Sequence, residues 1–173
     1  FTLFARWHVE GRENVPRRGP LIVVSNHRSY GDPPVVGASI PRRVYFLGKR
    51  GLFDTPIIGR LLHWCGVYPI DRNGRDVHAL KWAQELVRHD GAVVLFPEGT
   101  RNPRGMRAAL PGVTYLALKT QASILPVGIT GTEKITNLWR LPFPLCRMRV
   151  RIGQPFSLPV IEGDIPRIQM EEL

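Results

Sequence analysis

The chain has 173 residues and a mass of 19.6 kDa, which suits one domain and leaves too little length for two. Hydrophobic residues make up 43% of the chain and charged residues 22%, so the composition excludes an intrinsically disordered protein. The formal net charge is +10, and 20 of the 24 cationic residues are Arg. This excess predicts an anionic partner, and composition alone leaves nucleic acid, a membrane surface and a phosphorylated small molecule open.

The cysteine count and the chain ends add further bounds. Cys65 and Cys146 are too few for a disulfide framework or a four-ligand zinc site, and we expect both to be buried free thiols. No apolar run reaches the roughly 18 residues that a membrane span needs. The chain begins with Phe1 and ends in a segment that resembles the start of a helix. We therefore expect a single domain over residues 1–173 that is truncated at both ends.

The first half of the chain alternates between short apolar runs and a helical segment. The β-branched run at 21–24 and the apolar run at 44–47 predict buried strands. Residues 53–65 predict a helix, with Thr55 as its N-cap, Pro at its first position and Gly after its last. A third strand is expected at 67–70.

The second half continues the alternation. Residues 76–89 carry a helical apolar stripe, 92–96 predict a fourth buried strand, and 112–121 predict a short helix. A fifth strand is expected at 124–129, and 147–152 alternate strictly, as an edge or antiparallel strand does. The pattern predicts an α/β fold in which helices flank a mostly parallel mixed sheet.

Polar and charged residues follow four of these strands. In parallel sheets, ligand sites gather beyond the carboxyl ends of the strands. Turns alone rarely need so much acidic and basic content, so these segments predict an active site at that edge. They are residues 25–32, 71–72, 97–101 and 130–132.

Within the first segment, His27 and Asp32 fit a general base and the carboxylate that orients it. A turn between them can bring the imidazole and the carboxylate together. Chance produces a His with an Asp five residues later about one time in six in such a chain, so the spacing alone is a weak signal. We interpret the other histidines as helix-face or loop residues, namely His8, His63, His78 and His89.

Several motifs of other enzyme classes are absent from the sequence. There is no G-x-S-x-G nucleophile elbow, no phosphate-binding P-loop, no G-x-G-x-x-G after a strand and no metal-ligand spacing. A base without a protein nucleophile favours activation of a substrate hydroxyl. The sequence therefore favours direct group transfer without a covalent enzyme intermediate.

Four segments resemble, in order, the motifs of the glycerolipid acyltransferase family, which includes the lysophosphatidic acid acyltransferases. The first is N-H-x-S-x-x-D at 26–32, and the second is G-V-Y-P-I-D-R at 66–72. The third is F-P-E-G-T-R at 96–101, and the fourth is L-P-V-G-I at 125–129, followed by Gly-Thr. The similarity runs from about residue 15 to residue 155 and implies a glycerol-3-phosphate acyltransferase-like fold.

The resemblance implies an O-acyltransferase of phospholipid biosynthesis. It would move a fatty acyl group from acyl-CoA or acyl carrier protein to the free hydroxyl of lysophosphatidate. His27 would be the general base and Asp32 would orient it, with no covalent acyl-enzyme. Backbone N–H groups near His27 or Gly99 would stabilise the oxyanion. The acyl thioester would be a co-substrate, and no further cofactor or metal is implied.

The resemblance also implies substrate-binding residues. Arg72 and Arg101 would bind the phosphate of the acceptor, and Glu98 and Gly99 would shape the glycerol site. For Glu98 an ion pair with Arg101 is an equal alternative. The remaining members of this set are Asn26, Ser29, Thr100 and Pro126.

Two of these residues keep a second interpretation. Thr100 can cap the segment that follows it, and Pro126 either shapes the wall near the acyl chain or is purely structural.

Relatives often have a Phe-Lys pair before the glycine that opens the next helix. Residues 108–112 here read A-A-L-P-G instead, with Arg104 and Arg107 as substitutes for the charge of the Lys. The acceptor therefore stays open, with glycerol 3-phosphate, another lysophospholipid or a glycolipid as alternatives.

Lipid acceptors lie in a bilayer, so we expect the protein to be peripheral or anchored at the cytoplasmic face of the cell membrane. Clusters of Arg and Lys would contact anionic lipid. The segment 139–145 is either an interfacial loop or an ordinary buried connection. We expect an acyl thioester donor, a phosphorylated lipid acceptor and an anionic membrane surface as partners, and no nucleic acid. A non-catalytic nucleic-acid-binding module is the remaining alternative, which only the net charge supports.

Overall fold

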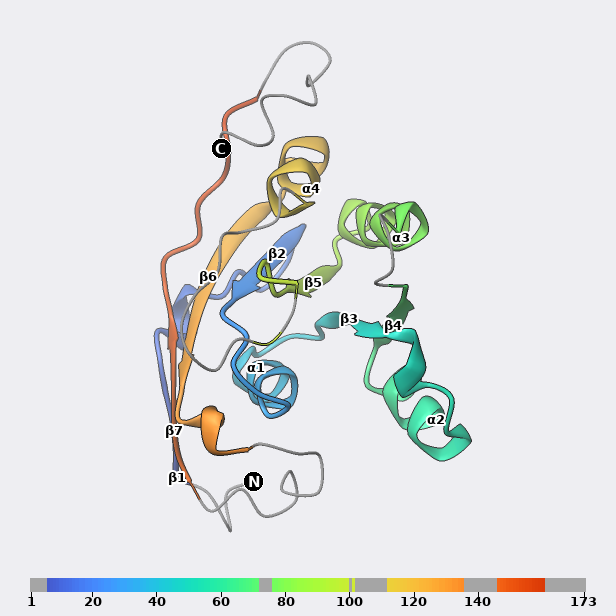
Figure 1. Cartoon of the computed structure of the whole chain (residues 1–173). Helices are drawn as coiled ribbons and strands as arrows, with labels where there is room; N and C mark the ends of the chain where they lie inside the picture. The colour runs from blue at the N-terminus through green and yellow to red at the C-terminus, as the bar shows by residue number, and fades with distance from the viewer. Residues whose placement is uncertain (1–5, 72–75, 100, 102–111, 136–145, 161–173) are drawn as a thin grey trace.

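The computed structural model describes residues 6–71, 76–99, 101, 112–135 and 146–160. These residues form a seven-stranded sheet in the order β1-β7-β6-β2-β5-β3-β4, with helices on both faces (Figure 1). The predicted α/β class and mixed sheet are confirmed. The strands are β1 Arg6–Glu10, β2 Leu21–Ser25, β3 Tyr45–Lys49, β4 Val67–Ile70, β5 Ala92–Leu95, β6 Ser123–Thr130 and β7 Arg147–Ile152.

Four α-helices lie in the described part of the chain. Helices α1 and α2 lie on one face of the sheet, and α3 and α4 lie on the other (Figure 1). Their ranges are α1 Asp32–Ser39, α2 Pro56–Trp64, α3 Val77–Arg88 and α4 Gly112–Thr120. Three 3-10 turns accompany them, η1 Arg12–Asn14, η2 Arg50–Leu52 and η3 Thr132–Lys134.

Strand β7 pairs antiparallel with β6, as its alternating sequence predicts. The other predicted option, that β7 is an edge strand, is wrong. Strand β1 pairs parallel with its outer side and forms the edge of the sheet instead. The sequence Arg-Trp-His-Val-Glu of β1 contains only two apolar residues, which is too few to predict a strand.

Strand β2 lies in the middle of the sheet between β5 and β6 and is parallel to both. Leu21 and Val23 pack on the α1 side, whereas Ile22 packs on the side of α3 and α4. A strand buried on both faces reads as a continuous apolar run, which explains why β2 was predictable. The carboxyl end of β2 therefore opens at the centre of one sheet edge.

Two local expectations differ from the structure. Cys146 is buried as expected, but Cys65 is exposed at the end of α2. Thr55 occupies the N-cap position of α2 without a side-chain hydrogen bond, whereas Asp76 caps α3 by accepting the Ala79 N–H.

No helix in the described ranges has both the length and the apolar content that a bilayer span requires. The segment 139–145 lies outside the described residues.

Candidate active site

The loop that leaves β2 brings His27 and Asp32 together. His27 Nδ1 lies 2.9 Å from Asp32 Oδ2, and both residues are buried. Asp32 is the first residue of α1, where the helix N-terminus favours a carboxylate. The predicted pair is therefore formed, and only five residues of chain are needed to form it.

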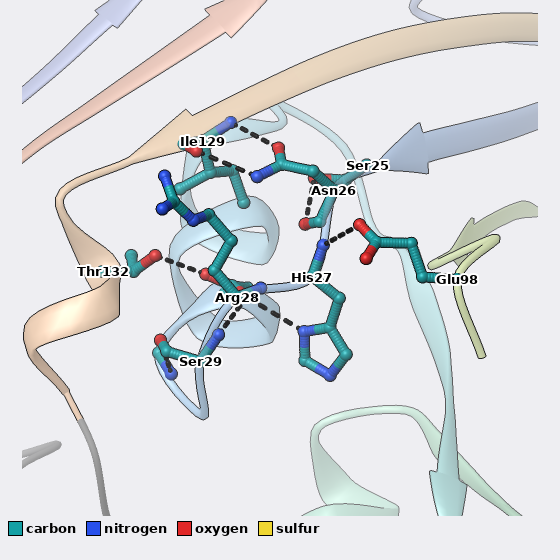
Figure 2. A network of polar contacts seen from close by, with 10 residues as sticks. Ser25, Asn26, His27, Arg28, Ser29, Glu98, Ile129 and Thr132 are labelled. Atoms are coloured by element: carbon teal, nitrogen blue, oxygen red, sulfur yellow. Dashed lines mark hydrogen bonds and ion pairs between the residues drawn. The ribbon is translucent and has the colours of Figure 1, made fainter. Parts of the chain in front are cut away.

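The hydrogen bonds of Asp32 decide which nitrogen of His27 carries a proton. Asp32 Oδ2 also accepts the backbone N–H groups of Arg28, at 2.6 Å, and Ser29, at 2.7 Å. An oxygen that accepts two N–H groups cannot donate to the imidazole, so His27 Nδ1 is the donor of this pair. In the neutral ring, Nε2 then carries the lone pair of a general base. Figure 2 shows the His27 ring pointing away from the Glu98 side chain, and its second nitrogen has no dashed contact with any residue drawn.

Thr132 binds the second carboxylate oxygen of Asp32. Its Oγ1 donates to Asp32 Oδ1 at 2.5 Å, and both side chains are fully buried. Thr132 opens η3 directly after Gly131, whose φ of 90° is left-handed. A Cβ at Gly131 would lie 1.9 Å from the Arg147 backbone oxygen, so this tight turn requires glycine. Thr132 belongs to the fourth motif, but its spacing alone gives no sign of this contact.

Residues after β5 hold His27 from another side. The Phe96 ring stacks on the imidazole, with centroids 4.2 Å apart and planes 25° apart. Glu98 Oε1 accepts the His27 backbone N–H at 3.2 Å, whereas its Oε2 is buried and has no hydrogen-bond partner among the described residues. Figure 2 shows Glu98 and Thr132 reaching the loop from opposite sides. The alternative ion pair between Glu98 and Arg101 is absent among the contacts of the described residues.

Asn26 and Ser29, which the resemblance assigns to substrate binding, have intramolecular partners. The Asn26 amide donates to the Ile129 backbone oxygen at 3.0 Å and accepts the Ile129 N–H at 2.8 Å. Ser29 Oγ accepts the Gly31 N–H at 2.9 Å and is buried. Asn26 thus ties the loop to β6, and Ser29 closes the turn before α1.

Arg101 is exposed, and its guanidinium carbon lies 3.5 Å from the centre of the Tyr30 ring. Tyr30 belongs to the His27 loop, so this cation–π contact holds the Arg101 charge beside that loop. Sequence reasoning did not single out Tyr30, and no motif position marks it. The other predicted phosphate ligand, Arg72, and the predicted cap Thr100 lie outside the described residues.

The expected oxyanion donors are already engaged. The N–H of His27 donates to Glu98, and those of Arg28 and Ser29 donate to Asp32. Gly99, with a left-handed φ of 66°, donates its N–H to the Phe96 carbonyl at 3.0 Å. In this structure these four amides shape the loop, and the expected oxyanion donors stay a prediction.

Pro126 lies in the sheet level with the carboxyl ends of β2 and β5, because Val24 pairs with both Pro126 and Leu95, the last residue of β5. It belongs to β6, where it stands opposite Val24, and its carbonyl accepts the Gly153 N–H at 2.8 Å. Both interpretations of Pro126, as part of the wall near the acyl chain and as a purely structural residue, therefore stay predictions. Across the described ranges, no group of three His, Cys, Asp or Glu is arranged to hold a metal ion.

Comparisons with known proteins show the family of the chain. A model of the Acyltransferase family matches residues 6–130. The chloroplastic 1-acyl-sn-glycerol-3-phosphate acyltransferase LPAT1 of Arabidopsis thaliana is 35% identical over 136 residues, which cover 76% of this chain and 38% of that protein. The 1-acyl-sn-glycerol-3-phosphate acyltransferase of Streptococcus pneumoniae is 27% identical over 167 residues, which cover 95% of this chain and 59% of that protein. The chain thus spans less than two thirds of these two relatives.

A solved structure is also similar. It is the crystal structure of the 1-acyl-sn-glycerophosphate acyltransferase PlsC from Thermotoga maritima, with a TM-score of 0.72 and 26% sequence identity. The match covers 98% of this chain and 69% of that chain.

Proposed function

The chain belongs to the Acyltransferase family, and we propose that it moves a fatty acyl group from an acyl thioester to the free hydroxyl of lysophosphatidate. The printed names of its relatives support this acceptor, since they are 1-acyl-sn-glycerol-3-phosphate acyltransferases. The observation that carries the proposal is the buried His27–Asp32 pair, with Nε2 of His27 available as a base.

In the proposed reaction, His27 Nε2 removes the proton of the acceptor hydroxyl as its oxygen attacks the thioester carbonyl. A C–O bond forms, and the tetrahedral intermediate collapses with cleavage of the C–S bond. The departing thiolate takes the proton back from His27, so the imidazole returns to its neutral form. The products are the acylated acceptor and the free thiol of coenzyme A or of the carrier protein.

Asp32 supports this cycle by stabilising the imidazolium that forms on His27. Thr132 and the backbone N–H groups of Arg28 and Ser29 keep the carboxylate in place. The stacked Phe96 ring restricts rotation of the imidazole. These contacts support a base that is positioned before the substrate binds, which lowers the cost of reaching the transition state.

For the acceptor, we propose that Arg101 and Arg72 bind the phosphate and that the glycerol part lies beside Glu98 and Gly99. Arg101 is exposed at the His27 loop, where its charge is accessible to a phosphate. The Glu98 side chain contacts the His27 backbone, so it lies next to the base. We propose no cofactor besides the acyl thioester, and a location at the cytoplasmic face of the cell membrane, peripheral or anchored.

A radiolabelled acyl-transfer assay tests the proposal. Purified protein is given acyl-CoA or acyl carrier protein together with lysophosphatidate, glycerol 3-phosphate, another lysophospholipid or a glycolipid. We expect the highest turnover with lysophosphatidate, and a loss of about a hundredfold or more in His27→Ala, whose unfolding temperature stays unchanged. Arg101→Gln is expected to raise KM for phosphorylated acceptors only.

Full turnover by His27→Ala would contradict the base mechanism. A different preferred acceptor would retain the chemistry and replace lysophosphatidate. Absence of acyl transfer, together with tight and salt-dependent nucleic-acid binding, would instead support the non-catalytic alternative.

A further inference from the structure

Helix α2 exposes its large apolar side chains instead of burying them. Ile57 is 79% exposed, Leu61 56% and Trp64 80%, and Ile58 is also exposed. We call these four residues the α2 face. Helix α3, by contrast, packs its apolar stripe against the sheet. An exposed apolar cluster of this kind on a soluble domain indicates an interaction surface.

The arrangement follows from how α2 meets the rest of the domain. Gly59 is its only buried residue, and a Cβ there would lie 3.0 Å from the Phe53 backbone oxygen. The helix therefore packs through its glycine side. Ile57, Leu61 and Trp64 follow the spacing i, i+4, i+7 and share one side of the helix. In Figure 1, α2 stands beside β4, the last strand of the sheet, apart from α1, α3 and α4.

The charge around this face is positive. Lys49, Arg50 and Arg60 are exposed, and Asp54 is the one acidic residue between residues 49 and 64, which leaves this segment with a formal charge of +3 − 1 = +2. No acidic residue lies within α2 itself. Aliphatic and Trp side chains flanked by cations match the boundary between headgroups and acyl chains of an anionic bilayer. Trp in particular favours that boundary.

The face also starts at the edge of the sheet that holds the base. Strands β2 and β3 are both parallel to β5, so their carboxyl ends lie at one edge. His27 follows β2 at this edge, and η2 and α2 follow β3 there. A bilayer against α2 would therefore lie on the side from which a lipid acceptor reaches His27.

We propose that the α2 face docks on an anionic lipid bilayer. Ile57, Leu61 and Trp64 enter the boundary region, and Lys49, Arg50 and Arg60 contact the headgroups. This inference rests on the proposed function, since a lipid acceptor is what makes a bilayer the partner. A helix of nine residues, about 13 Å long, lies in the plane of the membrane and does not cross it.

Vesicle flotation tests the docking surface directly. The 173-residue chain is mixed with vesicles of phosphatidylcholine alone or with a one-third share of phosphatidylglycerol. We expect binding to the anionic vesicles, and about a tenfold or greater loss in Ile57→Ser/Leu61→Ser/Trp64→Ser. The matched control is Val77→Ser/Val160→Ser, which removes side chains that are 54% and 73% exposed outside α2 and is expected to bind like wild type.

A second variant tests the charge. Lys49→Gln/Arg50→Gln/Arg60→Gln keeps the apolar residues and is expected to lose most of the preference for anionic vesicles and most of its salt dependence. Unfolding temperatures of all variants establish that they are folded. Wild-type binding by the apolar triple variant would overturn the proposal. So would a wild-type dimer that this variant converts to a monomer on size exclusion, because the face would then bind a second copy.

Activity with a monomeric short-chain acceptor separates this inference from the proposed function. The apolar triple variant is expected to match wild type on that acceptor and to lose turnover about tenfold when the acceptor lies in anionic vesicles. If no acceptor is acylated but flotation depends on α2, the proposed function fails and the docking surface stands. If acylation is found and flotation does not depend on the α2 face, the docking proposal is overturned and the proposed function is retained.

Discussion

Thr132 Oγ1 donates a hydrogen bond to Asp32 Oδ1 at 2.5 Å, and 100 residues separate the two in sequence. The bond joins the turn after β6 to the first residue of α1, and water is excluded from both side chains. Asp32 thereby has a partner on each carboxylate oxygen, since its Oδ2 binds His27. Thr132 is thus a positioning residue for the proposed base.

Thr132→Val keeps the shape of the side chain and removes the donor. We expect kcat to fall about tenfold to a hundredfold, because a hydrogen bond to a charged group contributes about 1.5–3 kcal/mol. Steady-state kinetics measure this loss. Thr132→Ser retains the hydroxyl and is expected to recover most of the activity, so an equal loss in Ser and Val would argue for a packing role only.

Two variants of Glu98 separate its contact with the His27 loop from a role in acceptor binding. In Glu98→Gln, the amide oxygen can still accept the His27 N–H, and an NH₂ group replaces Oε2, for which the described part of the chain provides no hydrogen-bond partner. We expect Glu98→Gln to change the free energy of unfolding less than Glu98→Ala does, and to raise KM for the acceptor. Glu98→Ala leaves the His27 N–H without its acceptor, which costs about 1–3 kcal/mol of stability. Urea unfolding and acceptor titrations distinguish them, and unchanged kinetics in Glu98→Gln would exclude a substrate role for Oε2.

We expect Asn26 to support activity by stabilising the fold, and not by binding substrate. Its two hydrogen bonds to Ile129 attach the His27 loop to β6. Asn26→Ala removes both and is expected to lower the free energy of unfolding by about 1–3 kcal/mol, with a parallel fall in kcat as the loop loosens. Asn26→Asp keeps the acceptor for the Ile129 N–H and is expected to lose less. A change in acceptor KM without loss of stability would point back to substrate binding.

The sequence predicts those parts of the site that residues close together in the chain form. Helix α1 begins at Asp32, five residues after His27, so one turn forms the pair. The run Leu-Ile-Val-Val predicts β2 within one residue because a central strand is buried on both faces. The contact between Glu98 and His27 spans 71 residues and depends on β5 lying beside β2, which no single segment encodes.

The features that the sequence does not show have a similar origin. The donors near His27 and Gly99 are drawn into the turn itself, and a sequence motif gives no information about which amides a turn uses. The apolar pattern of 53–65 correctly predicts a helix, but a pattern cannot show that Gly59 turns inward and Trp64 outward. Which side of an amphipathic helix is buried depends on the space beside β4, and that is a tertiary property.

Asp76 gives a pH-dependent prediction. Its carboxylate accepts the Asp71 N–H at 2.8 Å and the Ala79 N–H at 3.0 Å at the start of α3. These bonds hold the pKa of Asp76 below its usual range, with the bond to Asp71 as the largest cause. A carboxyl group whose pKa is lowered by folding stabilises the fold above its unfolded pKa, and this stabilisation is lost as the pH falls through the folded pKa.

We therefore expect Asp76→Ala to lower the free energy of unfolding by about 1 kcal/mol at pH 7, the usual effect of losing an N-cap. The difference from wild type is expected to shrink at pH values below about 4, where unfolded Asp is protonated. The decrease is expected to be partial, because solvent screens this partly exposed carboxyl. Asp76→Asn retains a cap that does not titrate, so its difference from Asp76→Ala is expected to stay constant with pH. Asp71→Ala, which keeps the backbone donor, serves as the control. A pH-independent difference between wild type and Asp76→Ala would contradict the lowered pKa, because the titration of this carboxyl would then be the same in the folded and unfolded chains.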